Sequence, residues 1–186
     1  HEVFECIDFS DSRKDTPAQC NEIREQAQRS FIRAGLNITD NKVLDQTTSM
    51  VWNALHAKLP IIYGGSQGNG SFKLCDLESN AHFPEVEFEL NADDSPKILK
   101  AYATGSIDLV FVRDGRYSIV DWKTNRMTPE MLCNADCIKK NVDEHYAIQR
   151  VLYAYCLIQW LKSFPDFENK TEEAIFREHF GGIYYV

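Results

Sequence analysis

The chain has 186 residues, 44% of them hydrophobic, which is enough to bury the core of one domain. Its formal net charge of −8 argues against a protein that binds nucleic acid through overall charge alone. The apolar runs are too short to span a bilayer, and no basic-then-apolar signal segment opens the chain. We therefore expect a cytoplasmic domain with no membrane partner, in which site carboxylates account for part of the negative charge.

The first half of the chain is expected to be mainly helical. Residues 1–9 have the pattern of the end of a helix, and Thr16-Pro17 predicts a capped helix that ends at Gly35. A second helix is expected over residues 41–58, followed by a loop over the Gly- and Ser-rich residues 63–71. The packed face expected for this second helix consists of Val43, Thr47, Met50, Val51, Ala54 and Leu55.

The second half is expected to carry the strands. Alternating acidic and apolar residues predict a strand over residues 85–90, and another strand is expected over residues 181–186. A hairpin whose first strand starts near Ile98 is expected between them. Residues 128–142 are expected to combine a short helix and a mobile loop, and an amphipathic helix is expected over residues 146–164.

The hairpin is the most informative part of the sequence. Asp114-Gly115 separates two apolar, β-branched runs, which is the strongest short-range signal for a two-residue type I′ turn. With this turn, Asp108 and Asp121 face each other, and their Cβ atoms are expected to lie roughly 5 Å apart. Two carboxylates at that separation repel each other, so a positive group is expected between them.

Lys123 lies two residues after Asp121, and strand alternation places its ammonium on the same face. Two interpretations remain open at this point. In the first, Lys123 forms a structural salt bridge with one or both acids. In the second, the carboxylates hold Mg²⁺ for phosphodiester hydrolysis, and Lys123 positions the attacking water or stabilises charge on the phosphate.

Further motifs make a family resemblance specific. Gly-x-x-Asp ending at Asp108, Asp-x-Lys at Asp121, and the Gln149–Tyr153 segment resemble the RecB exonuclease branch of the PD-(D/E)xK nuclease superfamily. The segments at 1–9, 87–88 and 179–182 also resemble the nuclease domain of exodeoxyribonuclease V beta subunits. The resemblance covers essentially the whole chain, and the hairpin and the Gln149–Tyr153 segment are its most specific parts.

The resemblance implies an α/β fold of the restriction-endonuclease-like kind, with a mixed central β-sheet flanked by helices. It implies that residues 1–186 are a single nuclease domain, a fragment of a larger helicase–nuclease chain truncated at both ends. The implied activity is that of a metal-dependent deoxyribonuclease acting in double-strand break repair and homologous recombination. The implied partners are DNA, the gamma and alpha subunits of the complex, and the strand-exchange recombinase.

The resemblance also assigns site residues. It implies metal ligation by His1, Asp108, Asp121 and the backbone carbonyl of Trp122, with Asp108, Asp121 and Lys123 in catalytic roles. Gln149 and Tyr153, four residues apart on one helical stripe with Tyr146, are expected to support the site or hold DNA. Glu5 lies one turn after His1, where it either orients the imidazole or is an ordinary solvated glutamate.

Mg²⁺ is the expected cofactor, with Ca²⁺ or Mn²⁺ able to substitute. An iron–sulfur cluster is not expected, because Cys133 and Cys137 are the only close cysteine pair and no cysteine follows Cys156. No ATP site is expected, because the chain lacks a Gly-x-x-x-x-Gly-Lys-Ser/Thr loop. Two alternatives stay open: a catalytically silent module that docks a recombinase or partner subunits, and a stand-alone nuclease of the CRISPR-associated type.

Overall fold

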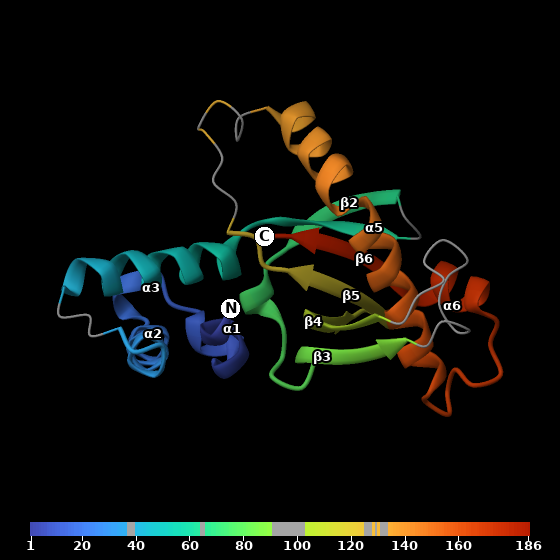
Figure 1. Ribbon diagram of the computed structural model, residues 1–186, viewed down its shortest axis with the longest axis horizontal. Coiled ribbons are helices and arrows are strands. Elements are labelled where there is room, and N and C mark those ends of the chain that lie inside the picture. Colours follow the sequence, from blue (N-terminus) through green and yellow to red (C-terminus); the bar gives the residue numbers. More distant parts are fainter. Residues whose placement is uncertain (37–39, 64–65, 91–102, 125–127, 129, 131–133) are drawn as a thin grey trace.

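A computed structural model describes residues 1–36, 40–63, 66–90, 103–124, 128, 130 and 134–186. The fold is α/β, with a mixed four-stranded sheet flanked by helices (Figure 1), as the restriction-endonuclease-like expectation requires. The strand order is β3-β4-β5-β6, and a two-stranded sheet, β1-β2, lies beside β6. No helix among these residues is long and apolar enough to cross a membrane.

The four-stranded sheet is antiparallel except at one edge, where β5 and β6 run parallel. The strands are β1 (Leu59–Tyr63), β2 (Ser66–Phe72), β3 (His82–Leu90), β4 (Ala103–Arg113), β5 (Arg116–Asp121) and β6 (Phe180–Tyr185). The helices are α1 (Glu2–Cys6), α2 (Asn21–Arg33), α3 (Asn41–His56), α5 (Ala135–Lys162) and α6 (Glu172–His179).

The two faces of the sheet bury two separate cores. Leu109, Phe111 and Val120 pack into the core formed with α1, α2 and α3. Val110 and Ile119, which alternate with them along the strands, pack into the core formed with α5 and α6. In Figure 1 the N-terminal helices and α5–α6 accordingly lie on different sides of the sheet. Both termini lie near the end of β5, where Lys123 donates its backbone N–H to the carbonyl of Val186.

The prediction of a loop over residues 63–71 is wrong, because most of this segment belongs to the β1–β2 hairpin. Gly and Ser contribute little side-chain preference for a strand, but their backbone groups pair with β1 as well as those of any residue. β1 in turn lies against β6, where Tyr184 donates its hydroxyl to the carbonyl of Pro60 at 2.8 Å. Tertiary pairing therefore decided the structure of a segment whose composition indicates a loop.

Several helix boundaries and faces differ from those expected. Thr16 caps a short 3₁₀ turn over Pro17–Gln19, and α2 begins only at Asn21, although Gly35 (φ 73°) follows its end as expected. α3 begins at Asn41 as expected and ends at His56, two residues before the expected end, and Val51 and Leu55 of the expected face are buried. The buried residues on α3 are Leu44, Thr48, Val51 and Leu55, and Met50 is exposed.

The C-terminal half contains more helix than expected. α5 begins at Ala135, eleven residues before the expected start, because the Asn134 side chain accepts hydrogen bonds from two backbone N–H groups of the first turn. α6 was not expected at all. The expected hairpin start near Ile98 and parts of the 128–142 segment lie outside the described residues. The described cysteines, Cys6, Cys20, Cys75, Cys137 and Cys156, are free.

Candidate active site

The hairpin has the turn and register that the sequence predicts. Asp114 and Gly115 have φ values of 52° and 72°, the left-handed pair that a type I′ turn requires. The pairing runs from Arg113 opposite Arg116 to Leu109 opposite Val120. This register brings Asp108, midway along β4, beside Asp121, the last residue of β5.

The backbone ladder stops one step before the two acids, and a side chain makes the next link between the strands. Oδ2 of Asp108 accepts the backbone N–H of Trp122 at 2.8 Å. β4 is also unpaired from β3 at this level, where Glu85 has a positive φ of 48°. Asp108 is therefore held by its own carboxylate rather than by a regular strand pair.

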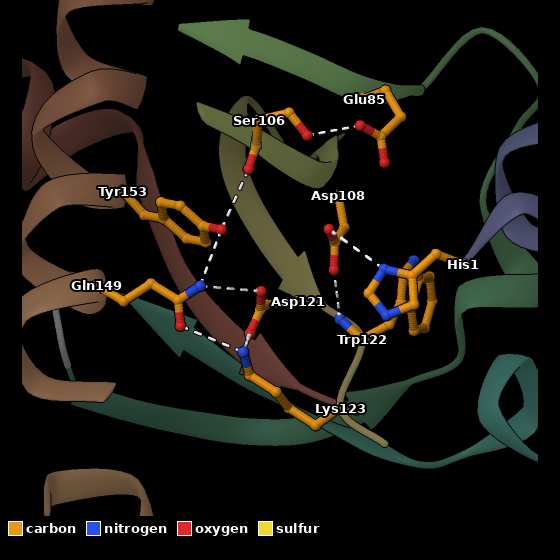
Figure 2. Close-up of polar contacts among 9 residues, drawn as sticks. All are labelled: His1, Glu85, Ser106, Asp108, Asp121, Trp122, Lys123, Gln149 and Tyr153. Atoms are coloured by element: carbon orange, nitrogen blue, oxygen red, sulfur yellow. Dashed lines mark hydrogen bonds and ion pairs between the residues drawn. The ribbon is translucent and has the colours of Figure 1, made fainter. Parts of the chain in front are cut away.

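The other carboxylate oxygen of Asp108 faces the N-terminus. Nδ1 of His1 lies 3.6 Å from Oδ1 of Asp108, and the imidazole is about half exposed. α1 is held in this position because Phe4 stacks on Trp122 with ring centroids 3.9 Å apart and planes 10° apart. Figure 2 shows His1 on one side of the two carboxyl groups, opposite Gln149 and Lys123. The predicted closeness of His1 to Asp108 is present, and metal ligation by His1 stays a prediction.

Asp121 is the buried acid of the site, with 3% of its surface exposed. Its Oδ2 forms an ion pair with Nζ of Lys123, so strand alternation placed the lysine as predicted. Burial raises the pKa of Asp121, the Lys123 ammonium and a hydrogen bond from Gln149 oppose that rise, and the nearby charge of Asp108 adds to it. The two carboxylates are thus close enough to repel each other.

Gln149 and Tyr153 connect this acid–lysine pair to β4 (Figure 2). Oε1 of Gln149 accepts from Nζ of Lys123 at 3.2 Å, and Nε2 donates to Oδ1 of Asp121 at 3.4 Å and to the Tyr153 hydroxyl at 2.9 Å. That hydroxyl donates to the backbone carbonyl of Ser106 at 3.1 Å. Burial raises the pKa of Tyr153 to about 12, so the phenol keeps the proton that it donates. Gln149 contacts both members of the acid–lysine pair, and the role of Gln149 and Tyr153 in supporting the site or holding DNA stays a prediction.

The glycine of the Gly-x-x-Asp motif has a packing reason. A Cβ added at Gly105 would lie 2.7 Å from the ring of Phe88. Phe88 packs edge-on against Tyr153, with centroids 6.1 Å apart. Gly105 thus leaves room for the ring that supports Tyr153.

Three residues that the sequence reasoning did not place in the site also lie there. The hydroxyl of Ser106 donates to Glu85 at 2.5 Å. Glu85 also interacts with Glu5, whose pKa is raised first by burial and then by the charge of Glu85. Glu5 therefore faces another carboxylate, which is not the role considered for it beside His1. Tyr185 is paired with Asp121 across β5 and β6. Only the pairing of distant strands could have revealed Tyr185.

The chemistry of the donor set fits a divalent cation. Carboxylate and carbonyl oxygens suit Mg²⁺, and an added imidazole suits Mn²⁺. In the described part of the chain, no three His, Cys, Asp or Glu side chains are gathered closely enough to form a complete metal centre. Instead, Lys123 neutralises Asp121, as in the first of the two interpretations that the sequence left open. The ion pair is compatible with both interpretations, and a catalytic role for Lys123 stays a prediction.

Comparison with known proteins points to one subunit. The chain is 36% identical to the RecBCD enzyme subunit RecB of Buchnera aphidicola subsp. Schizaphis graminum over 84 residues, which are 44% of this chain and 7% of that protein. It is 27% identical to RecB of Haemophilus influenzae over 113 residues, which are 59% of this chain and 8% of that protein. The matched segments are less than a tenth of the length of these relatives. No protein-family model matches the chain. These similarities indicate a RecB-related region.

Proposed function

We propose that this chain is the nuclease domain of a RecBCD-type helicase–nuclease and hydrolyses phosphodiester bonds of DNA with Mg²⁺. One observation carries the proposal. A buried aspartate, a second aspartate on the neighbouring strand and a lysine two residues after the first lie close together where β5 ends. The similarity to RecB supports the same assignment.

Asp108 and Asp121 would hold the cation, with the Trp122 carbonyl and the His1 imidazole completing its protein ligands. Mn²⁺ or Ca²⁺ would occupy the same donors. The bound ion would supply a Lewis acid for the phosphate oxygen and a water of lowered pKa. Asp108 lies midway along β4, beside Asp121 and Trp122 at the end of β5. His1 directly precedes α1, whose Phe4 stacks on Trp122.

Lys123, Gln149 and Tyr153 would stabilise charge on the phosphate and hold the lysine in position. The Lys123 ammonium, 21% exposed, faces the same region as the carboxylates and would stabilise negative charge on the phosphate. Gln149 would fix the direction of that ammonium through Oε1. Tyr153 would fix Gln149, because its hydroxyl is itself anchored on the carbonyl of Ser106.

The proposed partners follow from the same assignment. DNA would be the substrate, and the gamma and alpha subunits of the complex would supply the basic surface that a chain of net charge −8 lacks. The strand-exchange recombinase would be a further partner, and the proposed setting is double-strand break repair by homologous recombination in the cytoplasm. ATP would be used elsewhere in the assembly, and no iron–sulfur cluster is proposed.

The test is Asp121→Ala in the full-length chain assembled with its partner subunits. We expect Mg²⁺-dependent DNA degradation to disappear while ATP-dependent unwinding, which needs another part of the assembly, continues. Wild-type levels of degradation by this variant would refute the assignment.

A silent docking module is the competing function, and the closed Asp121–Lys123 ion pair is the observation that favours it. Calorimetric titration with Ca²⁺ separates the two. The nuclease assignment requires a binding site that Asp108→Asn removes, whereas a docking module would bind Ca²⁺ weakly and independently of Asp108.

A further inference from the structure

Two tyrosine rings lie close to the Lys123 ammonium. Nζ lies 4.1 Å from the ring centroid of Tyr146 and 5.7 Å from that of Tyr185. The rings stack on each other, with centroids 5.3 Å apart and planes 26° apart. Both lie within the distance at which a cation is attracted to the face of an aromatic ring.

The fold brings these rings to the lysine from two elements distant in sequence. Tyr185 is the partner of Asp121 across β5 and β6, and Lys123 continues that pairing by donating its backbone N–H to the carbonyl of Val186. Tyr146 lies three residues before Gln149 on α5, so the ring and the Gln149 amide reach the lysine from one helix face. The ammonium thus contacts a carboxylate, an amide oxygen and two ring faces.

We propose that Tyr146 and Tyr185 are positioning residues that retain the Lys123 ammonium once Asp121 is occupied by a divalent cation. The proposal rests on the proposed nuclease function. A carboxylate that ligates a cation no longer neutralises the lysine fully, and the cation repels the ammonium. The ring faces and Oε1 of Gln149 carry no net charge and do not ligate the metal, so these contacts are retained.

Tyr185 contacts the Lys123 ammonium through its ring and not through its hydroxyl. Its phenol oxygen is buried and has no hydrogen-bond partner within the described part of the chain. Phenylalanine therefore preserves the relevant contact and leucine removes it. The same pair of substitutions at Tyr146 tests the closer ring.

The first measurement does not depend on activity. Full-length protein is treated with an amine-reactive reagent, without metal and at saturating Ca²⁺, and labelling of Lys123 is followed by mass spectrometry. At saturating Ca²⁺ we expect Tyr146→Leu and Tyr185→Leu to speed labelling by roughly threefold or more, because each variant removes a cation–π contact that holds the ammonium. The corresponding Phe variants should stay close to wild type. Ile148→Ala, at a residue 65% exposed on the same helix, is the control for general disturbance of α5.

The second measurement is steady-state DNA cleavage with Mg²⁺. We expect the Leu variants to lose roughly tenfold in kcat, equivalent to about 1.4 kcal/mol, with little change in KM. The Phe variants should retain most of the activity. If a Leu variant fails to fold in urea titrations, Tyr→Met replaces it, since methionine fills the volume without a ring face.

The outcomes are separable. Unchanged labelling of Lys123 in the Leu variants overturns the proposal, as does faster labelling with unchanged kcat. Phe variants as impaired as the Leu variants would assign the effect to the hydroxyls and overturn it too. Absence of cleavage by the wild-type assembly would refute the nuclease function instead, while the labelling result still judges the role of the rings.

Discussion

Asp108 is tied to the residue that follows Asp121: Oδ2 of Asp108 accepts the backbone N–H of Trp122 at 2.8 Å. The hydrogen bond occurs where the backbone ladder between β4 and β5 ends. A residue assigned to metal binding therefore also closes the end of the hairpin, which gives it a measurable role in stability.

Asp108→Ala should destabilise the protein by about 1–3 kcal/mol, because the N–H of Trp122, a residue 5% exposed, loses its acceptor. Asp108→Asn keeps a carbonyl oxygen at that position and should lose much less stability. Both variants should lose Mg²⁺-dependent cleavage. Urea unfolding measures the difference, and equal stability losses in the two variants would argue against the hydrogen bond.

Lys123→Met should lower the free energy of unfolding more at high pH than at low pH. Without the ammonium, Asp121 is a buried, unpaired charge, which costs about 3 kcal/mol. The pKa of Asp121 is already raised by burial, and loss of Lys123 raises it further. Because the folded state then holds this proton more tightly than the unfolded state, stability falls as the pH rises from the ordinary aspartate pKa through the raised one.

The measurement is the free energy of unfolding of wild type and Lys123→Met at pH 5 and pH 8. The deficit of the variant should be larger at pH 8. Lys139→Met is a suitable control, because its ion pair with Asp143 lies on the exposed surface of α5. A deficit of Lys123→Met that does not change with pH would contradict burial of the Asp121 charge.

A second pH effect is expected far from the site. A hydrogen bond with the carboxyl of Asp11, with lesser contributions from burial and from the charge of Asp11, raises the pKa of Glu22 to about 7. The raised pKa means that the folded state binds the proton more tightly, so this pair stabilises the fold below the ordinary glutamate pKa. That contribution is lost as the pH rises towards about 7.

Glu22→Gln should therefore raise the melting temperature at pH 8 and have a smaller effect at pH 5. Thermal unfolding followed by circular dichroism checks this. Glu173→Gln on α6 is the matched control, since Glu173 pairs with Arg177 rather than with another acid. A Glu22→Gln effect of the same size at both pH values would show that no proton is shared with Asp11.

A ring contact with Trp122 contributes to the docking of α1, beside the ion pair of Glu2 with Arg33. Phe4 is 8% exposed and stacks on Trp122, so Phe4→Ala should cost about 3 kcal/mol of unfolding free energy. It should also free α1, measured as faster amide hydrogen exchange over residues 3–6. Phe4→Leu should cost less because it refills part of the space. Unchanged exchange in Phe4→Ala would mean that other contacts hold His1 beside Asp108.

Local rules were sufficient for the centre of this site. Asp114-Gly115 defined the turn, the turn defined the register, and alternation placed Lys123 beside Asp121. Spacing of four residues placed Gln149 and Tyr153 on one face of α5, where they hydrogen-bond to each other. Each of these relationships lies within one hairpin or one helix turn.

The rest depends on contacts between distant segments. Tyr185 reaches the site only because β6 pairs in parallel with β5, and no local pattern encodes that pairing. Glu85 faces Ser106 and Glu5 from a left-handed backbone position, which is uncommon for a glutamate and has no sequence signal. The Gly- and Ser-rich strand β2 is likewise formed by its partner β1 rather than by its own composition.

The proposed nuclease function requires Asp108 and Asp121 to share one divalent cation beside Lys123. Anomalous diffraction from a crystal of the protein soaked in Mn²⁺ can detect this cation. We expect a manganese peak roughly 2 to 2.5 Å from a carboxylate oxygen of each aspartate, with Lys123 displaced from Asp121 but still over the ring of Tyr146. A fully occupied peak elsewhere, or an intact Asp121–Lys123 ion pair at saturating Mn²⁺, would contradict it.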